Sequence, residues 1–179
     1  MLLDIVKADA VTFGSKPSSS VDILRRVCLN AFKFDKGLND LTQNMIDTMF
    51  AANGVGLAAP QVGIDLNLFV MRTAKGLEND SRDVHIIINP AVISTSNETY
   101  VDMEGCLSIP NIRGYVTRNK SILFSYVNSS GQHQQASLSG FSARIFQHEN
   151  DHLNGWLFTD RTDELWKKIK NEELGTATT

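Results

Sequence analysis

Gln147-His148-Glu149-Asn150-Asp151-His152 is the stretch that says most about this chain of 179 residues. On a helix, residues four positions apart share one face, so His148 and His152 can ligate one metal ion. Glu149 follows the first histidine and can reach a water molecule bound to that ion. The stretch therefore predicts a metal-assisted hydrolase built around a helix. The alternative is that both histidines merely lie on an amphipathic helix.

A third metal ligand is needed, because hydrolytic sites usually take three ligands from the protein and leave one position for water. The best candidate is Cys106, in Met103-Glu104-Gly105-Cys106-Leu107-Ser108-Ile109-Pro110. The glycine and proline of this segment disfavour a helix, and a thiolate beside a divalent cation is deprotonated. The alternative is that Cys106 is a small buried residue.

Gly54-Val55-Gly56-Leu57-Ala58-Ala59-Pro60-Gln61 is almost free of side-chain bulk. We expect a loop against which a peptide backbone can lie, closed by an amide on Gln61 that can donate hydrogen bonds. A tight turn into a strand beginning at Leu66 would explain the glycines about as well.

Helical patterns lie towards both ends of the chain, and the middle has strand patterns. Four helices are predicted. The first covers residues 21–32, and the second runs from a cap at Asn39 or Asp40 to a stop at Asn53-Gly54. The third runs from Phe141 to a stop at Asn154-Gly155, and the fourth covers residues 161–174. The predicted strands cover residues 66–71, 84–88, 121–127 and 134–138, with an exposed loop over 74–83, a hairpin turn at 128–131 and a frayed tail at 175–179. No repeat or linker divides this pattern. It predicts one α+β domain over residues 1–179, with an N-terminal lead-in at 1–20.

Composition narrows the class of protein further. With 42% apolar residues the chain can bury a core, so Cys28 and Cys106 need not pair and reduced thiols are expected. A net charge of −3 gives no broad basic surface for nucleic acid. The sequence has no apolar run of membrane-spanning length and no secretory leader. We therefore expect no membrane partner and a soluble, cytoplasmic protein, or an organellar one if a transit peptide has been removed.

Taken together, three motifs resemble those of peptide deformylase. They are Gly-x-Gly-x-Ala-Ala-x-Gln at 54–61, Glu-Gly-Cys-x-Ser at 104–108 and Gln-His-Glu-x-Asp-His at 147–152, in this order. The resemblance implies antiparallel sheets packed around a central metal-binding helix. It also implies removal of the N-formyl group from the initiator methionine of nascent polypeptides, with transient contact with the ribosome.

The resemblance assigns roles to particular residues. Fe²⁺ would be bound by Cys106, His148 and His152, and this ligand set also accepts Zn²⁺, Ni²⁺ or Co²⁺. Glu149 would move the proton from the attacking water to the departing amine. The Leu107 N–H and the Gln61 amide would stabilise the oxyanion.

Substrate contacts follow from the same resemblance and from helix phase. An extended peptide would lie along Val55-Gly56 and Gly105, using main-chain hydrogen bonds. Val55, Phe141 and Ile145 are candidates for an apolar methionine pocket, although each could equally be plain core.

Other polar residues of the motifs have open partners. Asp151 could orient a ligand or an arginine such as Arg118, or simply lie on a solvated helix face. Glu104 could pair with Arg113 or with Arg118.

Two other functions fit part of the pattern. A zinc peptidase would use the same His-Glu-x-x-His arrangement, although Cys106 and the small 54–61 segment argue against a wide cleft. An inactive, metal-stabilised module associated with the ribosome is the third hypothesis, and intact Glu149 and Gln61 argue against it.

Overall fold

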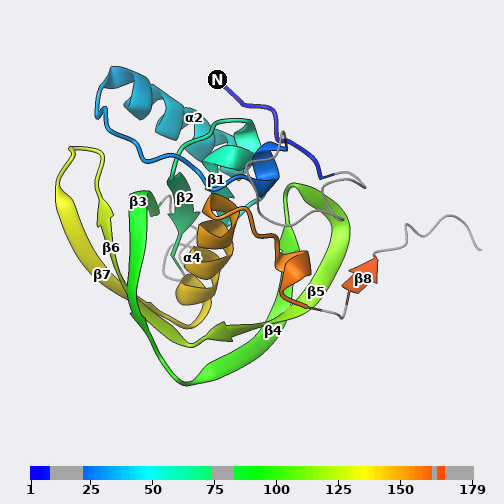
Figure 1. The fold of residues 1–179 in the computed structure, drawn as a ribbon. Helices are drawn as coiled ribbons and strands as arrows, with labels where there is room; N and C mark the ends of the chain where they lie inside the picture. Colours follow the sequence, from blue (N-terminus) through cyan, green and yellow to red (C-terminus); the bar gives the residue numbers. More distant parts are fainter. Residues whose placement is uncertain (9–21, 74–82, 163–164, 168–179) are drawn as a thin grey trace, which may run out of the picture.

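Two antiparallel sheets lie on either side of one central helix in the computed structural model, which describes residues 1–8, 22–73, 83–162 and 165–167. One sheet has the order β1-β2-β3-β6-β7, with β1 at Gly56–Ala58, β2 at Leu68–Arg72, β3 at Val84–Thr95, β6 at Ser121–Val127 and β7 at His133–Ser139. The other has the order β4-β5-β8, with β4 at Thr99–Cys106, β5 at Ile109–Asn119 and β8 at Leu165–Lys167. The helices are α2 at Lys36–Ala51 and α4 at Gly140–Leu153, with short 3-10 turns η1 at Ile23–Arg25, η2 at Ala59–Val62 and η3 at Phe158–Asp160. Figure 1 shows α4 between the two sheets, which confirms the predicted α+β arrangement.

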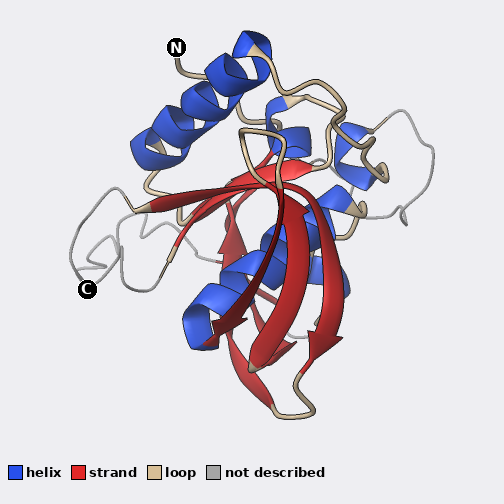
Figure 2. Ribbon diagram, turned by 90° about the vertical axis from the view of Figure 1, so that its left-hand side faces the viewer, coloured by secondary structure: helices blue, strands red, loops and turns tan. Residues whose placement is uncertain are grey.

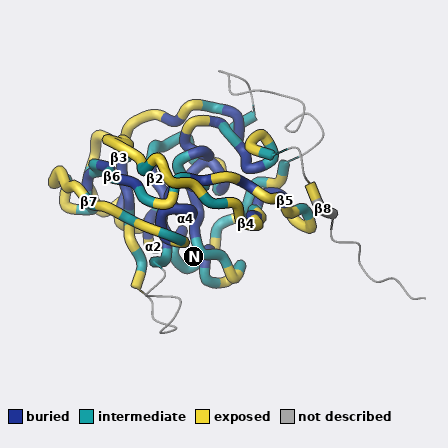
Figure 3. Tube along the Cα trace, turned by 90° about the horizontal axis from the view of Figure 1, so that it is seen from below, coloured by how far each residue is buried: buried dark blue, intermediate teal, exposed yellow. Residues whose placement is uncertain are grey.

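Helix α4 is the structural centre of the molecule. One of its faces places Ala143, Phe146 and Leu153 in an apolar cluster with residues of the five-stranded sheet. The ring of Phe146 lies 4.2 Å from that of Phe124 and 5.2 Å from that of Phe69. Figure 3 shows α4 buried, with the more exposed strand segments around it. The helix ends at the predicted stop, where Gly155 has φ +71° and lies against the Arg25 backbone.

Helix α2 ends where the sequence predicts but begins earlier. Asp35, not Asn39 or Asp40, is the N-cap, and its side chain accepts a hydrogen bond of 3.1 Å from the Leu38 N–H. Asn39 and Asp40 are exposed residues inside the helix. The predicted cap was wrong because a residue with capping preference also occurs on the solvent face of a helix. Asn53 takes the left-handed conformation (φ 53°) just beyond the helix end.

The helix predicted over residues 21–32 was wrong in its described part. Only η1 is helical there, and the chain then runs extended, with Val27, Leu29 and Phe32 more than half exposed. The backbone hydrogen bonds go to other segments: the Cys28 N–H donates to Leu153 O at 2.9 Å, and the Ala31 N–H donates to Asn89 Oδ1 at 2.8 Å. Tertiary partners thus replace the local helical bonds that the apolar spacing indicated.

The predicted strands and hairpin are confirmed, with β3 extending beyond the predicted 84–88 to Thr95. Strands β6 and β7 pair around the predicted turn, in which Gly131 has φ +78°. Figure 2 shows the long strands passing beside the central helix. The terminal helix predicted over 161–174 was wrong at 165–167, which form β8 and pair with β5. The predicted loop at 74–83 (except Asp83), the tail at 175–179 and most of the lead-in lie outside the described residues.

Across the described ranges of the chain, no helix has the length and apolar character needed to cross a bilayer.

Candidate metal centre and substrate pocket

The three predicted metal ligands meet in space. Cys106 lies at the end of β4, and His148 and His152 lie one turn apart on α4. Their ligand atoms all lie within 4.8 Å of one another, and Cys106 Sγ is 3.3 Å from His152 Nε2. One thiolate and two imidazoles form a donor set that fits divalent transition metals. The residues present therefore fit a single metal ion.

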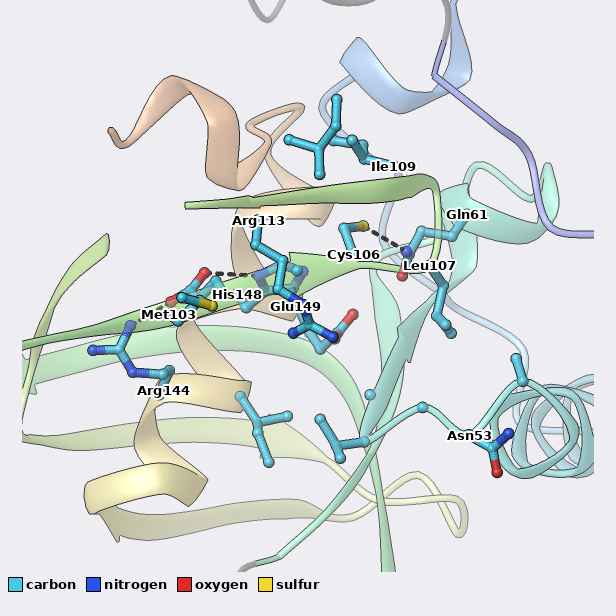
Figure 4. Close-up of a pocket in the computed structure, with 18 of the residues that line it drawn as sticks. Asn53, Gln61, Met103, Cys106, Leu107, Ile109, Arg113, Arg144, His148 and Glu149 are labelled. Carbon is cyan, nitrogen blue, oxygen red and sulfur yellow. Dashed lines mark hydrogen bonds and ion pairs between the residues drawn. The ribbon is translucent and has the colours of Figure 1, made fainter. Parts of the chain in front are cut away.

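Glu104 orients the first histidine. Its Oε2 lies 2.9 Å from His148 Nδ1, so the other ring nitrogen of His148 is left for a metal. Glu104 is itself only 6% exposed, and two arginines compensate its buried negative charge. Arg118 binds both carboxylate oxygens, at 2.9 Å and 3.0 Å, and Arg144 Nη1 binds Oε1 at 2.7 Å. Figure 4 shows Arg144, His148 and Glu149 gathered around the cavity.

The ion pairs left open by the sequence are now decided. Glu104 pairs with Arg118, whereas Arg113 lies over Gly105, 3.3 Å from where a Cβ on that glycine would be. Asp151 accepts a 2.6 Å bond from Arg118, which confirms the predicted pair, and a second 2.6 Å bond from Arg161. Burial alone would raise the pKa of Glu104, but hydrogen bonds from His148 and Arg118 outweigh burial and hold that pKa well below its ordinary value.

Arg144 was missed by the sequence reasoning. It is only 2% exposed, and its guanidinium donates to Val116 O and Tyr100 O, both at 2.9 Å, as well as to Glu104. An arginine on an amphipathic helix is ordinarily assigned to the solvent face. One signal could have found it, because Arg144 precedes His148 by four residues and so lies on the metal-binding face of α4.

Glu149 lies against the backbone of β1. A Cβ on Gly56 would be 2.7 Å from Glu149 Cδ, so only glycine leaves room for this carboxylate. Glu149 is 4% exposed, and its Oε2 has no hydrogen-bond partner among the described residues. Burial raises the pKa of Glu149 to about 7, against the opposing effect of a charge on His148. A buried acceptor without a partner, next to a metal site, is suited to receive a proton.

Gln61 is fixed on several sides. Its Oε1 accepts a 2.8 Å bond from the Ala58 N–H, while its Nε2 lies 3.3 Å from Cys106 Sγ and 3.2 Å from Ser108 Oγ. The loop or tight turn expected over 54–61 is instead the buried strand β1 followed by η2. Leu107 lies in the turn between β4 and β5, with its side chain 2.9 Å from where a Cβ on Gly54 would be.

A cavity of about 550 Å³ lies over these residues. It reaches both β1, an edge strand of the larger sheet, and β4, an edge strand of the smaller one. All five predicted substrate contacts line it, namely Val55, Gly56, Gly105, Phe141 and Ile145. Glu149, Gln61, Leu107, Cys106 and His148 line it too, whereas His152 is the predicted site residue that does not. Met103, Arg113 and Arg144 are additional lining residues.

The sequence matches known proteins over most of its length. A sequence model of the family described as polypeptide deformylase matches residues 14–168. A peptide deformylase of Thermotoga maritima is 43% identical over 152 residues, covering 85% of this chain and 88% of the relative. A peptide deformylase of a Synechocystis species is 43% identical over 155 residues, covering 84% of this chain and 81% of the relative.

Solved structures agree with the sequence matches. The crystal structure of peptide deformylase from Thermotoga maritima superposes with a TM-score of 0.77 at 39% identity, covering 90% of this chain and 97% of that one. A Met-Ala-Ser-bound peptide deformylase from Acinetobacter baumannii superposes with a TM-score of 0.77 at 31% identity, covering 90% of this chain and 99% of that one.

Proposed function

The chain belongs to the polypeptide deformylase family, and from that premise we propose how its residues remove the N-formyl group from the formylmethionine of nascent polypeptides and release formate. One observation carries the proposal. The ligand atoms of Cys106, His148 and His152 converge within 4.8 Å of one another beside a buried carboxylate on Glu149. We treat residues 1–179 as one catalytic domain.

The proposed metal ligands are Cys106, His148 and His152, and the proposed ion is Fe²⁺, with Zn²⁺, Ni²⁺ or Co²⁺ as substitutes. The mixed sulfur and nitrogen set accepts all four ions, so availability decides among them. When bound, such an ion supplies Lewis acidity and brings the pKa of water to about neutrality. Glu104 keeps the His148 ring turned so that its free nitrogen faces Cys106 and His152.

Glu149 is the proposed proton carrier. It takes a proton from the attacking water as the C–O bond to the formyl carbon forms. It then gives that proton to the amine nitrogen as the C–N bond breaks, so that formate and a free N-terminus leave. Gly56 makes this position possible, since any side chain there would displace the carboxylate.

Two donors would stabilise the oxyanion that forms on the formyl oxygen. They are the amide Nε2 of Gln61, beside Cys106 Sγ, and the backbone N–H of Leu107, which follows Cys106 directly. Loss of one such donor typically lowers kcat about 10²-fold to 10³-fold.

The peptide would bind as an added strand between β1 and β4, along Val55, Gly56 and Gly105. The methionine side chain would enter the apolar part of the cavity formed by Val55, Phe141 and Ile145. The A. baumannii relative bound to Met-Ala-Ser supports a peptide that begins with methionine. Because the substrate is a nascent chain, transient contact with the ribosome is also part of the proposal.

Formate release from formyl-Met-Ala-Ser under anaerobic conditions tests this function, with the protein loaded with Fe²⁺ or with Zn²⁺. We expect formate with Fe²⁺, and a loss of about 10²-fold to 10⁴-fold for Glu149→Gln with metal still bound. Glu98→Gln, at an exposed glutamate paired with Lys120, is the matched control and should keep full activity.

Two results would contradict the proposal and favour another function. Cleavage of the Met-Ala bond in unformylated Met-Ala-Ser would favour a peptidase. A fully metal-loaded protein that releases no formate would favour an inactive binding module.

A further inference from the structure

The N-terminal residues 6–8, which we call the N-terminal strap, cross beside the proposed oxyanion donors. The Val6 N–H donates to Gln61 O at 2.8 Å. The Lys7 ammonium donates to Leu107 O at 2.6 Å, and the Ala8 N–H donates to Ser108 O at 2.9 Å. Each residue of the strap thus bonds to an oxyanion donor residue or to its immediate neighbour. In Figure 4 the N-terminal trace passes beside Gln61.

These bonds close a ring. Val6 is bonded to Gln61, the Gln61 Nε2 donates to Ser108 Oγ at 3.2 Å, and the Ser108 carbonyl accepts from Ala8. The ring joins η2, which holds one donor, to the β4–β5 turn, which holds the other. Neither element pairs with the other in a sheet, so the strap supplies links between them beyond those of Gln61 itself.

The strap is anchored on both sides. Upstream, the Leu3 N–H donates to Thr48 Oγ1 on α2 at 2.9 Å, and the Leu3 side chain packs against the apolar cluster that contains Met45 and Met49. Downstream, Ala8 packs against the cluster that contains Ile109, together with the metal-ligand candidate Cys106. The strap therefore connects the helix α2 to the floor of the site.

The β4–β5 turn needs such support. The register of β4 and β5 shifts between Gly105 and Cys106, and Leu107 lies outside the ladder. Oxyanion donors act only when they are fixed where charge develops, and a displacement of about 1 Å can cost about 10²-fold in rate.

We propose that residues 6–8 are a positioning element that fixes Gln61 and the Leu107 turn relative to each other, so that their loss lowers turnover rather than substrate binding. This inference rests on the function proposed above. Among the described residues the Lys7 ammonium has one hydrogen bond, to the Leu107 carbonyl, and Lys7 does not line the cavity, so it acts through the donors and not on the substrate.

The first test replaces Lys7 with methionine, which keeps the length of the side chain and removes the ammonium. We expect kcat to fall about 10-fold, the effect of one charge-assisted hydrogen bond, with KM unchanged. Lys120→Met is the matched control, because Lys120 is also exposed and bonds at 2.7 Å, but to Glu98 in another part of the fold. It should keep kcat within about twofold, since surface ion pairs contribute little.

A second pair of measurements separates positioning from general damage. Ala8→Pro removes the donor to Ser108, and we expect a fall in kcat of about 10-fold from the loss of this link. In a Gln61→Leu background, the effect of Lys7→Met on kcat should shrink, because one of the two positioned donors is already gone. Metal content should equal that of the unaltered protein.

Amide hydrogen exchange at Leu107 and Ser108 gives a readout that does not depend on activity. Exchange at these two amides should speed up in Lys7→Met and stay unchanged in Lys120→Met. This expectation holds even if the unaltered protein releases no formate. The absence of formate would overturn the proposed function and leave the strap proposal to be judged by exchange. The strap proposal is overturned if exchange is unchanged, if kcat stays within twofold in Lys7→Met, or if KM alone rises.

Discussion

Helix α4 meets the five-stranded sheet through apolar side chains, whereas it meets the three-stranded sheet through buried ions. On the first side, Phe146 packs between the rings of Phe69 and Phe124. On the second side, Arg144 and His148 bond to Glu104 of β4, and Asp151 bonds to Arg118 of β5. The metal ligands lie on this second side.

Apolar packing and buried ion pairs differ in what they can fix. Apolar burial scales with area and fixes no direction, so it holds the helix without orienting one ring. Ion pairs and their hydrogen bonds are directional, although buried ions are weak contributors to net stability. We infer that the ionic side exists chiefly to aim His148 and the apolar side to hold α4 in place.

The two cysteines give the largest expected difference between the two sides of α4. Cys28 lies on the apolar side and Cys106 lies on the ionic side. Burial, aided by the charge of Asp65, raises the pKa of Cys28 to about 12, so this thiol stays neutral as pH rises through the usual range. Against the ordinary value of 9.0, that is about 10³-fold less thiolate at a given pH. Alkylation of the metal-free protein at pH 8 should modify Cys106 and leave Cys28 untouched, and Zn²⁺ should protect Cys106.

Mass spectrometry reads out that labelling site by site. Cys106→Ser should take up no label and Cys28→Ser should take up one. Equal labelling rates at the two cysteines of the folded, unaltered protein would contradict the assignment of Cys28 to a closed apolar cluster.

Glu104→Gln removes the central carboxylate of the ion pairs on the ionic side of α4. It leaves Arg118 and Arg144 without their shared carboxylate, which should cost about 3–5 kcal/mol in the free energy of unfolding. The metal affinity should also fall about 10-fold to 100-fold, because His148 loses the acceptor that orients it. Denaturant unfolding with a chelator present measures the first effect, and competition titration measures the second. Glu98→Gln, with its exposed partner Lys120, should change neither.

Phe146→Leu weakens the apolar side by a smaller amount. Three fewer buried carbon atoms, at about 0.8 kcal/mol each, lower the free energy of unfolding by about 2 kcal/mol. Metal affinity and kcat of the folded protein should stay unchanged, since the cluster that holds Phe146 faces the five-stranded sheet and does not include Cys106. If Phe146→Leu lowered metal affinity as much as Glu104→Gln, the division between the two sides would be wrong.

Local patterns predicted much of this architecture. The helix after Phe141, its stop at Asn154-Gly155 and the hairpin at 128–131 depend on residues close in sequence, so spacing and turn chemistry were sufficient. The proposed metal ligands Cys106, His148 and His152 were also predictable, because cysteine and histidine are metal-binding residue types and occur within the motifs. Their convergence in space agrees with that prediction.

Features decided by distant partners were not predictable. The spacing from His148 places Arg144 on the metal-binding face of α4, but its acceptors lie 28 to 44 residues away, so no local pattern identifies them. The apolar spacing at 21–32 indicates a helix, yet the backbone there bonds to Leu153 and Asn89 instead. Strand β8 pairs with β5, a distant segment of the chain, where the local pattern indicates a helix.

X-ray absorption at the metal edge of the zinc-loaded protein tests most directly that one ion joins β4 to α4 through Cys106, His148 and His152. The spectrum should show one sulfur at about 2.3 Å and two imidazole nitrogens at about 2.0–2.1 Å. In Cys106→Ser the sulfur should disappear while both imidazoles remain. A spectrum of the unaltered protein with nitrogen and oxygen ligands but no sulfur would contradict this account.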